Sequence, residues 1–221
     1  MQKIVMTNGV AMLVEETVTD IVDLDEFRRG ISLNAVSTPV LPFGCIYYSE
    51  KDNHQILCVV RKAEVSDVNN ANRMYKVALP HRLYTFSVRN GQLRGILQHF
   101  ILAMPKDLKE EVFDAPFPNR TSDGSLCQSG VMMSNSKESL TFRVDHVVNQ
   151  VERTRFNTDH ISAAKTAMPS LFTEGAGGQY TQMLAKWKAW TEEHEETWEA
   201  SLKDIPWKKI GTLGQLIDGR R

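Results

Sequence analysis

Residues 40–103 carry the pattern that most restricts how this chain can fold. Short apolar runs are separated there by turn signals, and FGCIYYS and QILCVVR flank the polar turn EKDNH. Further on, Asn90-Gly91 interrupts a second alternating stretch. Asn-Gly is the strongest short hairpin signal because both residues tolerate a positive φ. The pattern predicts an antiparallel meander of about four strands.

Helical spacing replaces strand alternation in the C-terminal half. One apolar stripe favours a helix, although its valines leave a strand open: Leu140, Val144, Val147, Val148 and Val151. A second stripe predicts a helix over residues 179–203, between the breaker GAGG and Ile205-Pro206: Tyr180, Met183, Leu184, Trp187, Trp190 and Trp198. We expect this second stripe to pack on the sheet, and a partner-binding surface is the alternative.

Strands followed by helices predict the α+β class. The 221 residues are enough for one domain with an appendage. We expect an N-terminal extension over residues 1–39 packed on the core, a core over residues 40–170 and a C-terminal helical segment over residues 171–221. Within the extension, KIVM and VAMLVEE flank the turn signal Thr-Asn-Gly and predict a hairpin.

Composition and charge exclude several classes of function. The net charge of -1 lacks the basic excess of a general nucleic-acid binder, so no nucleic-acid partner is expected. No run approaches the roughly 18 apolar residues of a membrane span. The N-terminus lacks a sustained apolar stretch and turns acidic early, which argues against a signal peptide. We therefore expect a cytoplasmic protein with no membrane partner.

The cysteines and histidines show no metal-ligand spacing. The three cysteines are widely spaced with no CxxC pair, and none of the six histidines forms HExxH. Walker and GxGxxG motifs are absent as well, so we expect neither metal nor cofactor. Cys45 and Cys58 lie in apolar strand runs and are expected to be buried structural thiols. Strand alternation would place Cys45 and Tyr47 on one face and Ile46 and Tyr48 on the other.

The third cysteine lies in a different setting. The segment 104–130 is long, polar and punctuated by Pro and Gly, and loops of more than about 12 residues are often functional. Near its end, APFPNRTSDGSLCQSG places Cys127 after an Asp-Gly turn with small polar flanks. A thiol in such a place is reachable from solvent, as a reactive cysteine must be. The residues alone leave open whether Cys127 reacts or is a small apolar side chain after a turn.

The run PNRTSDGSLC resembles the active-site signature of ubiquitin-conjugating enzymes. Asn119 and Cys127 are eight positions apart, as in that family, with Gly124 in the turn and Leu126 immediately before the cysteine. VALPHRLYTFSVRNGQLRGILQHF, VFDAPFPN and DGSLCQSG resemble a bacterial branch more closely, the prokaryotic ubiquitin-conjugating-like family that includes PRTRC system protein B. The resemblance covers about residues 40–135. It implies a ubiquitin-conjugating-enzyme-like fold, with an active-site loop after the meander and C-terminal helices following.

The resemblance also implies a function. Cys127 would receive the C-terminal glycine of a ubiquitin-like modifier protein from an adenylating activating enzyme, and a lysine-bearing target would then take it. Asn119 would donate to the oxyanion or hold the loop, and an Asn that caps the turn is the alternative. Asp123, Gly124 and Leu126 would shape the binding loop. An acidic residue about thirty positions after the cysteine would line the lysine channel, which points to Asp159, with His160 as its neighbour and a solvated loop charge as the alternative.

Three departures and two alternative functions accompany the resemblance. Phe117 stands where the family has a His, and Gln128 stands where a Leu is typical. No amphipathic N-terminal helix is evident for docking an activating enzyme. A catalytically inactive module or scaffold that keeps the fold is one alternative function. A scaffold for DNA machinery on a plasmid or phage is another, although the charge argues against direct DNA contact. The branch suggests a bacterial system of antiviral defence or of a mobile element.

Overall fold

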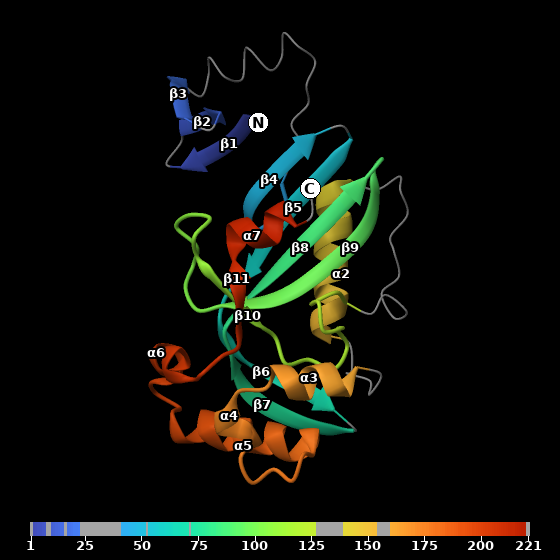
Figure 1. Cartoon of the computed structure of the whole chain (residues 1–221), viewed down its shortest axis with the longest axis vertical. Coiled ribbons are helices and arrows are strands. Elements are labelled where there is room, and N and C mark those ends of the chain that lie inside the picture. Colours follow the sequence, from blue (N-terminus) through green and yellow to red (C-terminus); the bar gives the residue numbers. More distant parts are fainter. Residues whose placement is uncertain are drawn as a thin grey trace.

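The apolar runs of the meander build the strands of one antiparallel sheet. The structure, a computed structural model, describes residues 2–7, 10–15, 17–22, 41–51, 53–70, 72–126, 139–153 and 160–219. Its central sheet has six strands and curls into a half-barrel, with helices from the C-terminal half packed around it (Figure 1). The predicted α+β class is confirmed.

The order of strands in this sheet follows the predicted meander. From edge to edge the strands are β11 (Lys209–Thr212), β10 (Glu111–Asp114), β9 (Gln92–Ile101), β8 (His81–Arg89), β5 (His54–Arg61) and β4 (Cys45–Lys51). The neighbours β4, β5, β8 and β9 are the four strands expected. Asn90 and Gly91 join β8 to β9 with φ values of 50° and 72°, the signs that a type I′ turn requires.

The predicted count of strands was too low. Residues 40–103 contain a further hairpin, β6 (Glu64–Asn70) and β7 (Arg73–Leu79), which pair only with each other among the described strands. The sequence of β6, EVSDVNN, lacks the apolar alternation that marked its neighbours. The long segment 104–130 likewise contains the short strand β10, and the C-terminal tail supplies β11.

Alternate residues of the sheet face two different cores. Leu57 and Val59 of β5 pack beneath helix α2 (Leu140–Arg153), with Val144 and its neighbours. Ile56, Cys58 and Val60 point the other way and pack with helix α7 (Leu213–Asp218). The helical reading of the valine-rich segment is confirmed, and the strand alternative is wrong.

The alternation predicted for β4 was wrong at its start. The register is irregular between Cys45 and Tyr47, because Cys45 lies opposite Val59 while Tyr47 lies opposite Cys58. A bulge of this kind adds one residue and exchanges the faces of those that follow. Cys45 and Tyr48 therefore pack with the α2 core, and Ile46 and Tyr47 pack with the α7 core.

The tryptophan stripe packs against the β6–β7 hairpin. Trp187 is fully buried, and its indole N–H donates to the carbonyl of Ala78 in β7 over 3.1 Å. Trp187 belongs to helix α5 (Tyr180–Glu193), and helices α3 (Ile161–Ala167) and α4 (Ser170–Thr173) pack in the same core. The packing role expected of this stripe is confirmed. The bounds of the helix are corrected, because α5 ends at Glu193 and a turn separates it from α6 (Trp198–Ser201) and η2 (Leu202–Asp204).

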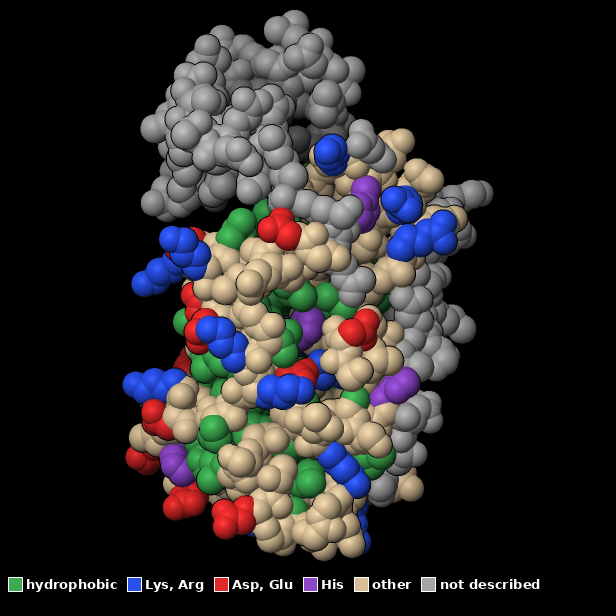
Figure 2. Space-filling model, in the orientation of Figure 1, with side chains coloured by type: hydrophobic (Ala, Val, Ile, Leu, Met, Phe, Trp, Pro, Cys, Tyr) green, Lys and Arg blue, Asp and Glu red, His purple; other side chains and the backbone are tan. Residues whose placement is uncertain are grey.

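The surface at the C-terminal end of α5 is acidic. Figure 2 shows Asp and Glu side chains gathered over α5 and α6, where the exposed glutamates of EEHEE lie. In the breaker before α5, Gly175, Gly177 and Gly178 all have positive φ.

The N-terminal strands form a small sheet of their own. Strands β1 (Gln2–Thr7), β2 (Val10–Glu15) and β3 (Thr17–Val22) pair in sequence order, which confirms the predicted hairpin and adds a third strand. The C-terminal part of the chain contacts the predicted core in two places. Strand β11 pairs with β10, and Trp187 of α5 packs in one core with Phe100 of β9. The division at residues 39 and 170 stays a prediction.

Candidate functional site

The segment 115–126, called the motif loop here, leaves β10 and returns to the edge of β9. It holds four of the predicted site residues, which are Asn119, Asp123, Gly124 and Leu126. Cys127 and Asp159 lie outside the described residues. The described part of the loop therefore ends one residue before the cysteine.

A buried ion pair fixes the first half of the motif loop. Arg120 is 1% exposed and Asp114, the last residue of β10, is 3% exposed. The Arg120 guanidinium bonds Asp114 and also donates to the carbonyl of Ala115 over 2.8 Å. Lys208 adds a second cation to Asp114 at 3.2 Å. Burial lowers the pKa of Arg120, and the charge of Asp114 opposes that effect.

Aromatic packing explains the departure at Phe117. This side chain is 2% exposed and meets Phe100 of β9 edge to face, with ring centroids 5.5 Å apart. The Tyr180 hydroxyl, from the start of α5, donates to the carbonyl of Pro116 over 2.6 Å. The loop is thus anchored from the apolar core, and Phe117 fills a place in that core.

Asp123 organises the turn that precedes the cysteine. Its carboxylate accepts the backbone N–H of Ser125 over 3.1 Å and the Ser125 hydroxyl over 2.9 Å, and it also bonds the Thr121 hydroxyl. The Thr121 N–H donates to the Ser125 carbonyl over 2.8 Å, which closes the turn. Asp123 therefore serves as the side-chain acceptor of an Asx-type turn, as its place before Gly124 predicted.

Gly124 is required at its position for two reasons. Its φ is +87°, a conformation that side chains disfavour. A Cβ there would also lie 2.6 Å from Cε1 of His99 and closer still to Nε2. His99 is 1% exposed, so its ring is enclosed by the core. The turn can approach β9 this closely only with glycine.

The last two residues of the motif loop bond to the backbone of β9, where they form an isolated β-bridge and not a strand. Ser125 pairs with Leu97, and the Leu126 N–H donates to the Ile96 carbonyl over 2.9 Å. The Gln98 N–H donates in turn to the Gly124 carbonyl over 3.0 Å. Leu126 is 4% exposed and packs with the valines of α2. The backbone that leads to Cys127 is therefore held by both the sheet and the helix.

Asn119 is half-buried, and His160 bonds the loop at the preceding residue, Pro118. The Asn119 Oδ1 is buried and has no hydrogen-bond partner among the described residues. The backbone N–H of His160 donates to the carbonyl of Pro118 over 3.2 Å, so residue 160 reaches the motif loop next to Asn119. Of the two candidates for the lysine channel, His160 is the one that the described residues bring to the loop.

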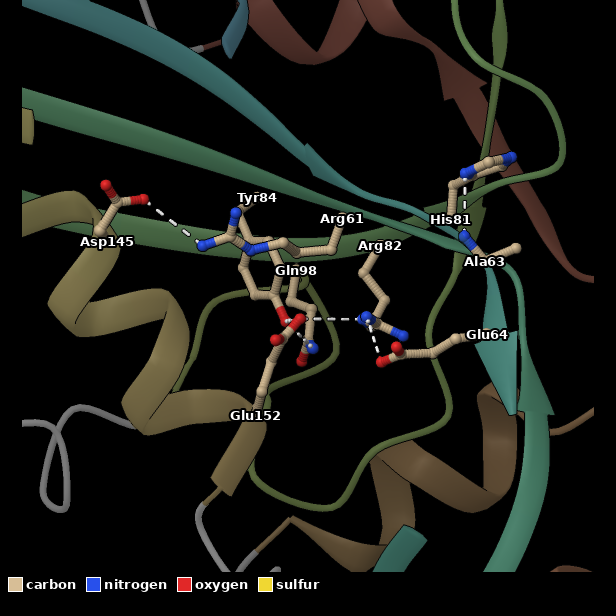
Figure 3. Close-up of polar contacts among 9 residues, drawn as sticks. All are labelled: Arg61, Ala63, Glu64, His81, Arg82, Tyr84, Gln98, Asp145 and Glu152. Atoms are coloured by element: carbon tan, nitrogen blue, oxygen red, sulfur yellow. Dashed lines mark hydrogen bonds and ion pairs between the residues drawn. The ribbon is translucent and has the colours of Figure 1, made fainter. Parts of the chain in front are cut away.

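A polar network behind the loop was not predicted from the sequence. It comprises Glu64, Arg82, Tyr84, Gln98 and Glu152, from β6, β8, β9 and α2 (Figure 3). Arg82 and Gln98 are 4% and 3% exposed. The signal for it was available, because a charged residue and an amide inside otherwise apolar strands require buried partners.

The two described cysteines are ill suited to nucleophilic chemistry. Burial raises the pKa of Cys45 to about 11, and burial raises that of Cys58 to about 12. Within the described ranges, no group of three His, Cys, Asp or Glu side chains could hold a metal ion. None of the helices described is long and apolar enough to cross a membrane.

Comparisons with protein-family models, curated proteins and solved structures found no match to this chain.

Proposed function

We propose that this chain is a cysteine-dependent acyl transferase of the ubiquitin-conjugating-like type, with a fold related to that of the conjugating enzymes. Cys127 carries a ubiquitin-like protein as a thioester and passes it to a lysine amine. The observation that carries this proposal is the construction of the motif loop. Buried contacts of Arg120, Gly124 and Leu126 anchor the loop, the exposed Asp123 closes its turn, and the residue after Leu126 is Cys127.

The order of elements supports the same proposal. Strands β4, β5, β8 and β9 lead through β10 into the motif loop, and α2 then crosses the sheet with Leu126 beneath it. This is the order that the family resemblance implies, with the β6–β7 hairpin as an insertion.

The chemistry has two acyl transfers. In the first, the Cys127 sulfur attacks the C-terminal carbonyl of the modifier on its activating enzyme, an S–C bond forms, and the activating enzyme's leaving group departs. In the second, a lysine amine attacks that carbonyl, an N–C bond forms, and the Cys127 thiolate leaves and takes up the proton that the amine loses. Both steps pass through a tetrahedral oxyanion.

Asn119 is the described residue suited to that oxyanion. Its Oδ1 is buried, and its side-chain amide also carries N–H donors of the kind that can bond an oxyanion. An amide donor of this kind contributes about 3 kcal/mol in other enzymes. Asp159 or His160 assists loss of the amine proton in this proposal, and the bond from His160 to Pro118 favours the neighbourhood of residue 160.

A charging assay tests the proposal. The chain is incubated with ATP, magnesium, an adenylating enzyme and its glycine-terminated ubiquitin-like protein, taken first from the genes that neighbour this one. We expect an adduct on non-reducing gels that thiol reductants remove, that Cys127→Ala abolishes and that Cys127→Ser converts into a reductant-resistant ester. Binding of the modifier without an adduct would instead indicate the catalytically inactive interaction module.

A further inference from the structure

Glu152, near the end of α2, connects this helix to Arg82 and Tyr84 of β8. Its Oε1 accepts the Nε–H of Arg82 over 2.9 Å and the hydroxyl of Tyr84 over 3.2 Å. Figure 3 shows the carboxylate between these two groups, and its side chain is 26% exposed. Arg82 also donates to Glu64, at the start of the β6–β7 hairpin, over 2.8 Å. Helix α2, strand β8 and the β6–β7 hairpin therefore meet at Arg82, through two ion pairs.

The network continues from Glu152 to the motif loop. Gln98 donates from Nε2 to the Tyr84 hydroxyl over 3.1 Å, while its backbone N–H donates to the Gly124 carbonyl over 3.0 Å. An unbroken series of hydrogen bonds thus runs from α2 through Tyr84 and Gln98 to the turn that precedes Cys127. Tyr84 and Gln98 are buried, so the hydrogen bonds that they make in this series satisfy groups that burial has removed from water.

Burial and the neighbouring groups both act on the pKa values of Arg82 and Tyr84. Burial opposes the charge of Arg82, but Glu152, Tyr84 and Glu64 together raise the pKa of its guanidinium. Burial also raises the pKa of Tyr84, with Glu152 reinforcing the effect, so its hydroxyl keeps its proton. Tyr84 can then donate only to Glu152 while it accepts from Gln98, which gives the series one direction.

Buried ionic groups seldom add net stability, and their best-attested use is to fix one arrangement of the chain. We propose that Glu152 is a positioning residue, which holds the end of α2 and the motif loop in one relative arrangement. The inference rests on the proposed function, in which the loop leads to Cys127 and the segment after α2 leads to Asp159. A shift of about 1 Å between reacting groups can cost about a hundredfold in rate.

Asp145 is a matched control on the same helix. It pairs with Arg61 of β5 over 3.4 Å, and its side chain is 33% exposed, close to the exposure of Glu152. In Figure 3, Asp145 lies farther from the network along α2 than Glu152 does, and it bonds Arg61 but not Tyr84 or Gln98. Asp145→Asn therefore loosens α2 on the sheet without touching the connection to the motif loop.

The test compares Glu152→Gln and Tyr84→Phe with Asp145→Asn and the unaltered chain. Tyr84→Phe keeps the buried ring, so it remains informative if Glu152→Gln fails to fold. Each protein is charged on Cys127 with the 2-mercaptoethanesulfonate thioester of acetyl-glycyl-glycine. In this exchange the Cys127 S–C bond forms and mercaptoethanesulfonate leaves as the thiol. Discharge to free lysine is then followed by mass spectrometry across lysine concentrations.

We expect Glu152→Gln and Tyr84→Phe to lower the maximal discharge rate about tenfold or more, with the KM for lysine within about twofold of its original value. Asp145→Asn should leave both within about twofold. Equal maximal rates in all four proteins, or an equal loss in Asp145→Asn, would overturn the inference.

Failure of the proposed function gives a separate signature. In that case the unaltered charged chain discharges to lysine no faster than it does in denaturing urea. The positioning inference is then decided by alkylation of Cys127 with iodoacetamide in the folded proteins. A rate changed in Glu152→Gln and Tyr84→Phe but not in Asp145→Asn supports it, and equal rates overturn it.

Discussion

Replacing Gly124 by alanine tests the most sharply defined feature of the motif loop. The substitution adds a single methyl group to a backbone with φ of +87°. Such a conformation costs a residue with a side chain about 1–2 kcal/mol. The new Cβ would also lie 2.6 Å from Cε1 of His99, whose ring is 1% exposed. Overpacking of this kind adds about 1–3 kcal/mol, so the expected loss of stability is about 2–5 kcal/mol.

Gly91 separates the two contributions. It has a similar φ of +72°, but nothing lies within 4 Å of the position that a Cβ would take. Gly91→Ala should therefore show the backbone cost alone, about 1–2 kcal/mol. The free energy of unfolding is measured by urea titration, with tryptophan fluorescence as the signal because Trp187 is buried.

A double-mutant cycle completes the experiment. His99→Ala removes the ring that the new methyl group would meet, so it should recover the part of the Gly124→Ala loss that comes from overpacking. If Gly124→Ala costs no more than Gly91→Ala, or if His99→Ala recovers nothing, then the turn does not approach β9 as described and the reasoning is refuted.

Three further perturbations address the ion pair, the buried thiol and a histidine. Asp114→Ala leaves the buried charge of Arg120 without its main partner and should cost about 3–5 kcal/mol in urea unfolding, whereas the double variant with Arg120→Met should be less unstable than Asp114→Ala alone. Burial raises the pKa of Cys58 to about 12, so iodoacetamide at about pH 8 should label it only as the chain unfolds, and rapid labelling of folded protein would contradict its burial. Burial lowers the pKa of His81, which accepts the Ala63 N–H at Nδ1, and therefore the unfolded chain binds its proton more readily. Stability from this group is complete above its ordinary pKa of about 6.5 and falls as the pH drops below that value. The loss of unfolding free energy on acidification should be smaller in His81→Gln, and an equal loss in both proteins would argue against this role.

The parts of the fold that the sequence predicted rest on local signals. Asn90-Gly91 specifies its hairpin because the turn itself demands positive φ at both residues. Helix α2 was predicted from the spacing of its valines. The strand alternative is wrong because that spacing places the valines on one face of a helix, and this face packs on the sheet. The turn at Asp123-Gly124 was likewise predicted from its residues alone.

The parts that escaped prediction depend on contacts between distant segments. The β6–β7 hairpin is buried through Trp187, more than 100 positions along the chain from its partner Ala78, and its own strand β6 is polar. The bulge at the start of β4 leaves no mark in the alternation of FGCIYYS. Helix α5 ends at Glu193 although the apolar stripe continues to Trp198, because the turn between them brings α6 back onto the same core.

The candidate site was predicted in the same uneven way. Asn119, Asp123, Gly124 and Leu126 follow from one contiguous motif, and the described structure brings them into one loop. The role proposed for Glu152 could not be predicted from the motif, since in the described part of the chain its connection to the loop runs through Tyr84 and Gln98. The assignments of Cys127 and Asp159 stay predictions.

The most direct test of the central claim is the mass of the chain after charging. The protein is incubated with ATP, the adenylating enzyme and the glycine-terminated modifier, and then digested and mapped without reductant. We expect a modifier remnant on the peptide that contains Cys127, lost on treatment with dithiothreitol and absent from Cys127→Ala. A chain that stays unmodified while the activating enzyme itself is charged, or a remnant found on Cys45 in place of Cys127, would show that Cys127 does not carry the modifier.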